Sequence, residues 1–141
     1  MTIDKLTPEE IENNLSYATG TNNYYQYRSP IGGVKMGVYT DGVKHMAEIC
    51  SAYWLIDLIF SYQIKSKIRQ EPFQVWTLEK RTYKTGRKRG QEYWKAIATD
   101  GNDNIIVQQT IEYSNFPLES IKMYLTDDYY HKKVLMLITE Y

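Results

Sequence analysis

The spacing of apolar residues changes along the chain, from a helical repeat in the first half to strand-like alternation in the second. Near the start, Thr7-Pro8-Glu9-Glu10 has the order of N-cap, proline and glutamate that is typical of a helix start. Ile11, Leu15 and Ala18 follow at helical spacing. We therefore predict a short first helix that ends before Gly20.

A dense apolar stretch then predicts one long helix over residues 42–66, with Asp41 as its N-cap. Apolar residues fall on more than one side of this helix, so we expect it to be the central core helix, covered by a sheet. The preceding residues 21–42 are rich in Asn, Gly, Tyr and Pro, which makes a helix there unfavourable. For them we predict a long ordered loop or a short edge strand around residues 34–39.

The second half alternates apolar and polar residues, which predicts strands. The Asp100-Gly101-Asn102-Asp103 segment is a turn signal between two such runs and predicts a hairpin. A second hairpin is expected around residues 127–132, with a helix over 118–125 as the competing interpretation of its first strand. The predicted strands cover residues 73–80, 93–99, 105–113, 119–125 and 133–138.

These elements together predict a single α+β domain over residues 1–141. It consists of a short N-terminal helix and one long core helix, packed on an antiparallel sheet of about five strands. Short connections favour a meander as the order of those strands.

Charge and cysteine content narrow the range of functions. The chain has 17 basic and 17 acidic residues, so its global field does not steer it toward nucleic acid, and self-association as a homodimer meets little repulsion. Cys50 is the single cysteine, which excludes an intramolecular disulfide and a zinc site built from cysteines. No apolar run reaches about 18 residues. We expect a cytoplasmic protein without a membrane partner.

Several segments together resemble a known family. They are TDGVKHMAEICSAYWLIDLIFSYQ (40–63), FQVWTL (73–78), DGN (100–102), QTIEYSNFPL (109–118) and VLMLITEY (134–141). The chain is similar through them to an uncharacterised, domain-of-unknown-function family of bacterial proteins found on plasmids and prophage-like elements. The resemblance implies an accessory protein of a mobile element, of the kind that acts by binding host machinery, including defence systems. It implies no activity and no catalytic residue.

The sharpest local feature is KRTYKTGRKR, residues 80–89, in which six of ten residues are basic. Between two predicted strands it forms an exposed hairpin tip that can contact phosphates, with an aromatic ring available to stack on a base. It can equally contact an acidic protein surface, or serve as a solvated turn that keeps a strand edge soluble. The candidate partner-binding residues are Lys80, Arg81, Tyr83, Lys84, Arg87, Lys88 and Arg89.

A second candidate contact surface is the tyrosine-rich segment at residues 22–28. It follows from the 14 tyrosines of the chain, a residue type enriched at interfaces. Aromatic and guanidinium groups side by side make an adaptable contact surface; the alternative is a loop that lies over the core helix. The candidate residues are Tyr24, Tyr25, Tyr27 and Arg28.

Catalytic and metal chemistry are less favoured. Asp41, His45 and Glu48 lie near one face of the long helix, but no second group of metal ligands accompanies them. Asp57 stands alone among apolar neighbours, where a hydrogen bond from Tyr53 or Ser61 is expected. The glycine pattern matches no phosphate-binding loop. We predict no cofactor, no metal and no catalytic residue.

The leading hypothesis is a non-enzymatic binding protein of a mobile element or phage, acting on a host protein or ribonucleoprotein, for example as an inhibitor of a defence complex. A nucleic-acid-binding module that uses the basic tip is one alternative. An enzyme with a site near His45, Glu48 and Asp57 is the other.

Overall fold

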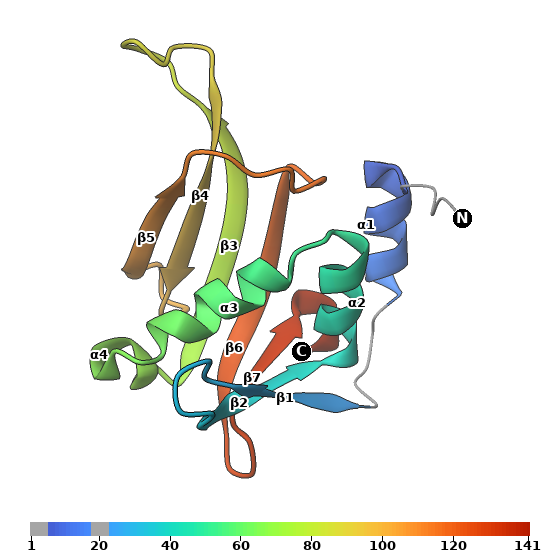
Figure 1. The fold of residues 1–141 in the computed structure, drawn as a ribbon, viewed down its shortest axis with the longest axis vertical. Coiled ribbons are helices and arrows are strands. Elements are labelled where there is room, and N and C mark those ends of the chain that lie inside the picture. The colour runs from blue at the N-terminus through green and yellow to red at the C-terminus, as the bar shows by residue number, and fades with distance from the viewer. Residues whose placement is uncertain (1–5, 18–22) are drawn as a thin grey trace.

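A computed structural model describes residues 6–17 and 23–141, in which seven strands form one mixed sheet (Figure 1). The strand order is β1-β2-β7-β6-β3-β4-β5. The strands are β1 (Tyr24–Arg28), β2 (Lys35–Thr40), β3 (Phe73–Thr82), β4 (Glu92–Thr99), β5 (Ile105–Ile111), β6 (Ser120–Asp128) and β7 (Lys132–Leu137). The helices are α1 (Pro8–Ser16), α2 (Asp41–Ile49), α3 (Tyr53–Tyr62), α4 (Ser66–Arg69) and the 3-10 helix η1 (Ile138–Glu140).

Helices α2 and α3 cross one face of the sheet, and the core lies between them and the strands (Figure 1). Alternate residues of β3, β4 and β6 point into this core, because successive side chains of a strand face opposite sides. Within the described residues, no helix has the length and apolarity to cross a membrane. Large core side chains include Met46, Ile56, Ile59, Phe60, Trp76, Leu78, Trp94, Met123, Leu125 and Leu135.

The first helix is confirmed, with the predicted capping box. The Glu10 backbone N–H donates to Thr7 Oγ1 over 3.2 Å, and the Thr7 N–H donates to Glu10 Oε1 over 3.2 Å. Ile11 is buried under α2, as its place in the apolar stripe requires. Ala18 and Gly20, which the sequence assigns to the helix end, lie outside the described residues.

The prediction of one long helix over residues 42–66 is wrong. The chain forms α2, α3 and α4, with a break at Ser51, whose φ of 53° lies in the left-handed region that no α-helix continues through. The N-cap is also one residue earlier than predicted: Thr40 Oγ1 accepts from the Val43 N–H over 3.2 Å, and Asp41 is the first helical residue. Apolar density therefore identified the core segment but not its interruption.

The predicted five-stranded antiparallel meander is also wrong, although the α+β class is confirmed. Residues 21–42 supply two strands, β1 and β2, where a loop or one edge strand was expected. After β2 the chain crosses over through the helices, and β2 then pairs in parallel with β7, through Val38 with Val134 and Tyr39 with Leu135. Pairing between segments so far apart in sequence leaves no trace in local alternation.

The two predicted hairpins are confirmed. Antiparallel β4 and β5 flank the turn at residues 100–103, where Gly101 and Asp103 have positive φ values of 86° and 67°. Antiparallel β6 and β7 form the second hairpin. Residues 120–128 are strand, which excludes the competing helix over 118–125. Strand β5 ends at Ile111, two residues earlier than predicted.

The close approach of β2 to its parallel neighbour β7 requires a glycine at position 37. A β-carbon placed there would lie 2.5 Å from the Lys133 carbonyl oxygen and 2.8 Å from Phe60 Cε1. Neither atom is the free end of a flexible side chain, because one belongs to the backbone and the other to a buried ring. Gly37 thus lets β2 approach β7 and α3 at the same time.

We expect Gly37→Ala to lower the free energy of unfolding by about 3 kcal/mol, because overpacking at this close approach forces the Lys133 backbone and the Phe60 ring to move. The matched control is Gly32→Ala, whose β-carbon has no neighbour within 4 Å and whose φ is 82°. In that control the free energy of unfolding should fall only by the cost of placing an alanine in the left-handed backbone region, about 1 kcal/mol. Urea unfolding of both variants gives the comparison, and equal losses would contradict close packing at Gly37.

Candidate functional site

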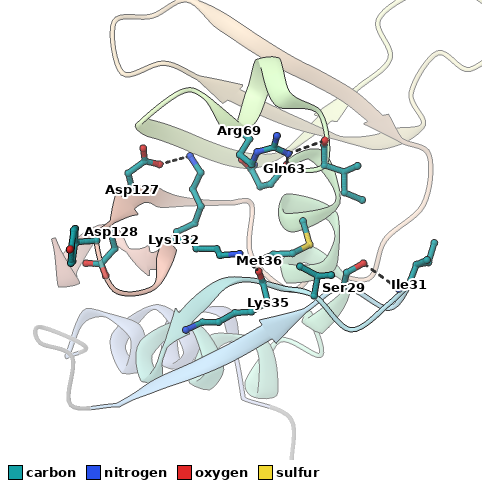
Figure 2. A pocket seen from close by; sticks show the side chains of 13 residues that line it. Ser29, Ile31, Lys35, Met36, Gln63, Arg69, Asp127, Asp128 and Lys132 are labelled. Carbon is teal, nitrogen blue, oxygen red and sulfur yellow. Dashed lines mark hydrogen bonds and ion pairs between the residues drawn. The ribbon is translucent and has the colours of Figure 1, made fainter.

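Three segments that are distant in sequence enclose a cleft of about 990 Å³ (Figure 2). They are the turn between β1 and β2, the region from the end of α3 to α4, and the turn between β6 and β7. This volume lies at the upper end of the range for small-molecule and peptide side-chain pockets. The lining residues are Ser29, Ile31, Val34, Lys35, Met36, Gln63, Ile64, Arg69, Asp127, Asp128, Tyr129, Lys132 and Lys133.

A buried amide pair fixes the wall of the cleft that follows α3. Gln63 Nε2 donates to Gln74 Oε1 over 3.0 Å, and Gln74 Nε2 donates to Gln63 Oε1 over 2.9 Å. Trp76 Nε1 also donates to Gln74 Oε1, over 3.0 Å. Both glutamines are buried and fully hydrogen-bonded, so the chain after α3 is held against β3. Ile64 and Arg69 take their positions in the cleft from this anchor.

The cleft carries exposed apolar side chains. Ile31 is 86% exposed, Val34 59% and Ile64 62%, while Tyr129 at the β6–β7 turn is 94% exposed. Six large aliphatic side chains are exposed in the described part of the chain, and three of them line this one cleft. Exposed aliphatic residues scattered singly are ordinary, but a group gathered around a concavity is typical of a contact site.

The charged residues of the cleft are unevenly paired. Lys133, with a buried side chain, donates to Asp127 Oδ1 over 2.6 Å and to the Glu71 carbonyl over 2.9 Å. Asp128 accepts from the backbone N–H groups of the turn that follows it. Both carboxylates are therefore occupied within the protein.

Three cations of the cleft have no carboxylate partner among the described residues. Arg69 donates through Nη1 to the carbonyls of Gln63 and Ile64, at 3.0 and 3.2 Å. Lys132 Nζ donates to the Lys35 carbonyl over 3.2 Å, and the Lys35 ammonium has no described partner. Figure 2 shows Arg69 on one side of the cleft and Lys35 and Lys132 on the other. The cleft thus combines apolar walls with uncompensated positive charge.

The basic tip predicted from the sequence is an arm that projects beyond the sheet between β3 and β4 (Figure 1). Gly86 and Gly90, with φ values of 81° and 85°, close its turn. All of its residues from Lys84 to Gly90 are exposed. The arm is ordered by backbone hydrogen bonds, among them Gly90 N–H to the Tyr83 carbonyl over 2.8 Å.

Half of the six cations in residues 80–89 are held by neighbouring carboxylates, and Lys80 and Arg81 among these lie in β3. Lys80 lies 3.1 Å from Glu92, Arg81 pairs with Glu79, and Lys88 lies 3.2 Å from Glu112. Each of these pairs is solvent-exposed, and such pairs contribute little to stability. The three cations without a partner among the described residues are Lys84, Arg87 and Arg89.

Tyr83 is already engaged within the arm. Its ring stacks on Tyr93 with centroids 4.2 Å apart, and its hydroxyl donates to Glu112 at 2.9 Å. Partial burial and this bond to a carboxylate raise the pKa of Tyr83, while the bond lowers the pKa of Glu112. Lys88 Nζ also lies over this ring, 5.5 Å from its centroid, so the ring is already engaged by two neighbours.

The tyrosine-rich segment is the edge strand β1, and its residues face two ways. Tyr25 and Tyr27 point toward the helices: Tyr25 stacks on Tyr39 with centroids 5.7 Å apart and lies under the Lys44 ammonium. Tyr24 is 48% exposed and lies beside His131, with ring centroids 5.0 Å apart. Asn22, at the start of the predicted region, lies outside the described residues.

The other exposed side chain of β1 is tied to its own hairpin. Arg28 Nη1 donates to the Gly33 carbonyl over 3.0 Å, and Nη2 donates to Gln26 Oε1 over 3.1 Å. Of the four candidate residues in this segment, Tyr24 and Arg28 are therefore exposed, while Tyr25 and Tyr27 are half-buried packing residues.

Tyr27 explains the isolated carboxylate of α3. Its ring stacks on Phe60 with centroids 4.4 Å apart, and its hydroxyl donates to Asp57 Oδ1 over 2.8 Å. The expected partners of Asp57, Tyr53 and Ser61, instead bond to Glu48 and to the Leu58 carbonyl. Burial, and next the bond to Asp57, raise the pKa of Tyr27 to about 12.

The residues that prompted an enzyme hypothesis do not assemble into a site. Asp41 starts α2, Glu48 accepts from Tyr53 and lies 3.8 Å from Lys44, and Asp57 belongs to the contact with β1. Across residues 6–17 and 23–141, no group of three His, Cys, Asp or Glu side chains could hold a metal ion. Cys50 is buried, and this burial raises its thiol pKa to about 11, which disfavours the reactive thiolate.

The arm and β1 lie far apart, on opposite sides of the strand order, so they do not form one continuous surface (Figure 1). The cleft was not predicted from the sequence. Its local signal was weak: Ile31, Val34 and Ile64 are isolated apolar residues in polar surroundings, and such residues are common on surfaces.

The chain matches a known protein family over most of its length. A family described as "Family of unknown function (DUF6876)" matches residues 9–141. The chain belongs to this family. No curated protein and no solved structure matches it. This match confirms the coarser part of the resemblance, a family of unknown function, and it covers α1 as well as all three surfaces described above.

The raised pKa of Tyr27 predicts a pH-dependent stability. In the unfolded chain this hydroxyl titrates near the ordinary value of 10.0, and in the folded chain near about 12. The stabilisation is therefore complete below pH 10 and is lost as the pH rises through 12. Tyr27→Phe lacks this contribution, so its unfolding free energy should fall less steeply than that of the wild type between these pH values.

Urea unfolding at stepped pH measures this difference. Tyr129→Phe is the control, because it removes an exposed tyrosine and should keep the steep fall. Parallel pH curves for wild type and Tyr27→Phe would show that the bond to Asp57 does not contribute.

Proposed function

We propose that this chain is a non-enzymatic binding protein whose main contact surface is the cleft between the β1–β2 turn, α4 and the β6–β7 turn. One observation carries the proposal: exposed apolar side chains from three distant segments, Ile31, Ile64 and Tyr129 among them, gather around one concavity. Water-exposed apolar groups gain free energy when a partner covers them, about 25 cal/mol for each Å² buried.

The charged residues of the cleft indicate which chemical groups the partner carries at the contact. Asp127 and Asp128 are occupied internally, whereas Lys35, Arg69 and Lys132 have no carboxylate partner among the described residues. An apolar side chain flanked by carboxylates is complementary to this arrangement. The fitting partner is therefore a protein with an acidic, apolar-anchored segment.

The sequence resemblance supports a biological setting for this binding. Relatives on plasmids and prophage-like elements suit an accessory protein that acts on a host protein or ribonucleoprotein by surface contact. An inhibitor of a host defence complex is the concrete form of this function, with the cleft as the surface that captures the host component.

Removing the apolar lining should abolish capture. We expect Ile31→Ser/Ile64→Ser to lose a bacterial protein that the immobilised wild type retains from lysate, because the change removes exposed apolar surface and leaves the core intact. Quantitative mass spectrometry of the retained proteins is the measurement.

The matched control is Tyr17→Ser/Ile138→Ser, which removes two exposed apolar side chains away from the cleft. A partner of the cleft is retained by the wild type and by this control and is lost from the cleft variant. If no protein behaves in this way, the cleft is not the contact surface.

A second function, binding of nucleic acid through the arm, is favoured by a separate observation. Lys84, Arg87 and Arg89 belong to the arm that projects beyond the sheet (Figure 1), and they have no carboxylate partner in the described part of the chain, as expected for groups that contact phosphates. Lys80, Arg81 and Lys88 contribute less, because Glu92, Glu79 and Glu112 already neutralise them.

Salt dependence tests this second function. If the three unpaired cations contact phosphates, Lys84→Gln/Arg87→Gln/Arg89→Gln should lower the slope of log affinity against log salt by about 2–3. The control, Lys80→Gln/Arg81→Gln/Lys88→Gln, makes the same change in charge and should lower it less. A mobility-shift titration with single-stranded RNA gives both slopes, and equal slopes would argue against contact by the tip.

A further inference from the structure

Strand β5 leaves an edge of the sheet open. It pairs with β4 on one side, and no strand of the described residues pairs with its other side. Figure 1 shows no ribbon beyond it. Its seven residues, IIVQQTI, include no charged residue and no proline. Proteins normally protect an edge with lysine, proline, a bulge or a very short strand, because its free N–H and C=O groups can pair with another strand.

The opposite edge of the sheet has such protection. Strand β1 has five residues, ends on Arg28, and its register shifts between Tyr27 and Arg28 as in a bulge. Pro30 follows within two residues. Strand β5 lacks charge and proline, and the register of its pairing with β4 shifts near its start, where Ile106 has no partner. The regular, uncharged part of this open edge is therefore residues 107–111.

We propose that β5 pairs antiparallel with β5 of a second copy of this chain, forming a two-fold homodimer with one continuous sheet. A contact of this kind is isologous, so the same strand serves both copies and the assembly closes at two. It goes beyond the binding function of the cleft and uses none of the cleft residues.

The register that overlaps the regular residues 107–111 of both copies is centred on Gln109. It places Val107 opposite Ile111 of the second copy. These two residues face the same side of the sheet, because they pair with Ala98 and Trp94 of β4 without a register shift between them. Cross-strand pairs of β-branched residues stabilise a sheet, so the side chains favour the same register as the regular part of the strand.

Charge complementarity selects a second copy as the occupant. The arm lies at one end of β4, and the β4–β5 turn, with Asp100 and Asp103, lies at the other end (Figure 1). Antiparallel pairing of two copies brings the arm of each to the end that holds the acidic turn of the other. The cations Arg87 and Arg89, which have no carboxylate partner among the described residues, then lie at the same end of the joined sheet as the acidic turn of the other copy. A net charge of zero adds no long-range repulsion.

Sedimentation velocity over a wide concentration range tests the dimer. The wild type should reach twice the mass of the chain and not grow beyond it. Gln108→Lys/Thr110→Lys adds lysines at two exposed positions of β5, which places like charges near one another across the two-fold axis. The dissociation constant of the dimer should rise by about tenfold or more.

The matched control is Gln26→Lys/Ser120→Lys, which adds the same charge at exposed positions on β1 and β6. It should dimerise like the wild type. A monomeric wild type at high concentration, continued growth beyond the dimer, or equal weakening of both variants would each overturn the proposal. Circular dichroism melting of the variants shows whether the fold is kept; if the β5 variant is unfolded, hydrogen exchange of the wild type decides.

Hydrogen exchange of the wild type locates the contact without any substitution. Amides of β5 should become more protected as concentration rises, while those of β1 stay unchanged. Protection that rises at β1 instead would place the contact at the other edge and reject β5.

A separate variant tests whether the charges of the acidic turn contribute to the affinity of the dimer. Asp103→Asn removes an acid from the turn, and Asn tolerates the φ of 67° at this position. The dimer of this variant should be weaker than that of the wild type and less sensitive to salt. An unchanged salt dependence would show that the arm and the turn do not meet. Each of these measurements is made without nucleic acid or partner protein, so its outcome is independent of the two functions proposed above.

Discussion

The parallel contact between β2 and β7 is the constraint on which the rest of the structure depends. It joins the first strands of the chain to the last, and it is possible because Gly37 has no side chain to meet the Lys133 carbonyl and the Phe60 ring. Without this contact, β1 and β2 would form an isolated hairpin, which is marginally stable in water. The close parallel pairing of β2 with β7 at Gly37 is therefore the reason that the sheet is mixed and seven-stranded.

The same contact creates the cleft. The turn between β1 and β2 comes to lie opposite the turn between β6 and β7, and the chain after α3 closes the third side. Buried polar groups then fix this arrangement: the amides of Gln63 and Gln74 bond to each other, and Lys133 bonds to Asp127 and to the Glu71 carbonyl. Burying such polar groups costs free energy unless they form hydrogen bonds. Their hydrogen bonds therefore hold each wall of the cleft in one position.

The surfaces of the molecule have distinct chemistry. The cleft presents apolar side chains with unpaired cations, the arm presents cations alone, and β5 presents uncharged backbone. Internal carboxylates shape this distribution, because Glu79, Glu92 and Glu112 neutralise the base of the arm and leave its tip charged. The contacts proposed with a protein segment, a phosphate backbone and a second copy of the chain therefore fall on separate surfaces.

Local pattern was sufficient for elements whose stabilising contacts are close in sequence. The Thr7 capping box fixed the start of α1, and the turn at residues 100–103 fixed the β4–β5 hairpin, because each depends on residues within a few positions. The basic composition of the arm was likewise evident from the sequence. The ion pairs of the arm could not be predicted in this way, since Glu112 reaches Lys88 from the segment after β5.

The sequence by itself thus determined the α+β class, the core helix segment, the hairpins and the presence of an exposed basic tip. Tertiary structure alone decided the break at Ser51, the parallel pairing of β2 with β7, the partner of Asp57 and the existence of the cleft. The physical reason is common to these four. Each of these features depends either on groups far apart in the chain or on a backbone conformation imposed by packing. Neither cause leaves a periodic pattern in the sequence.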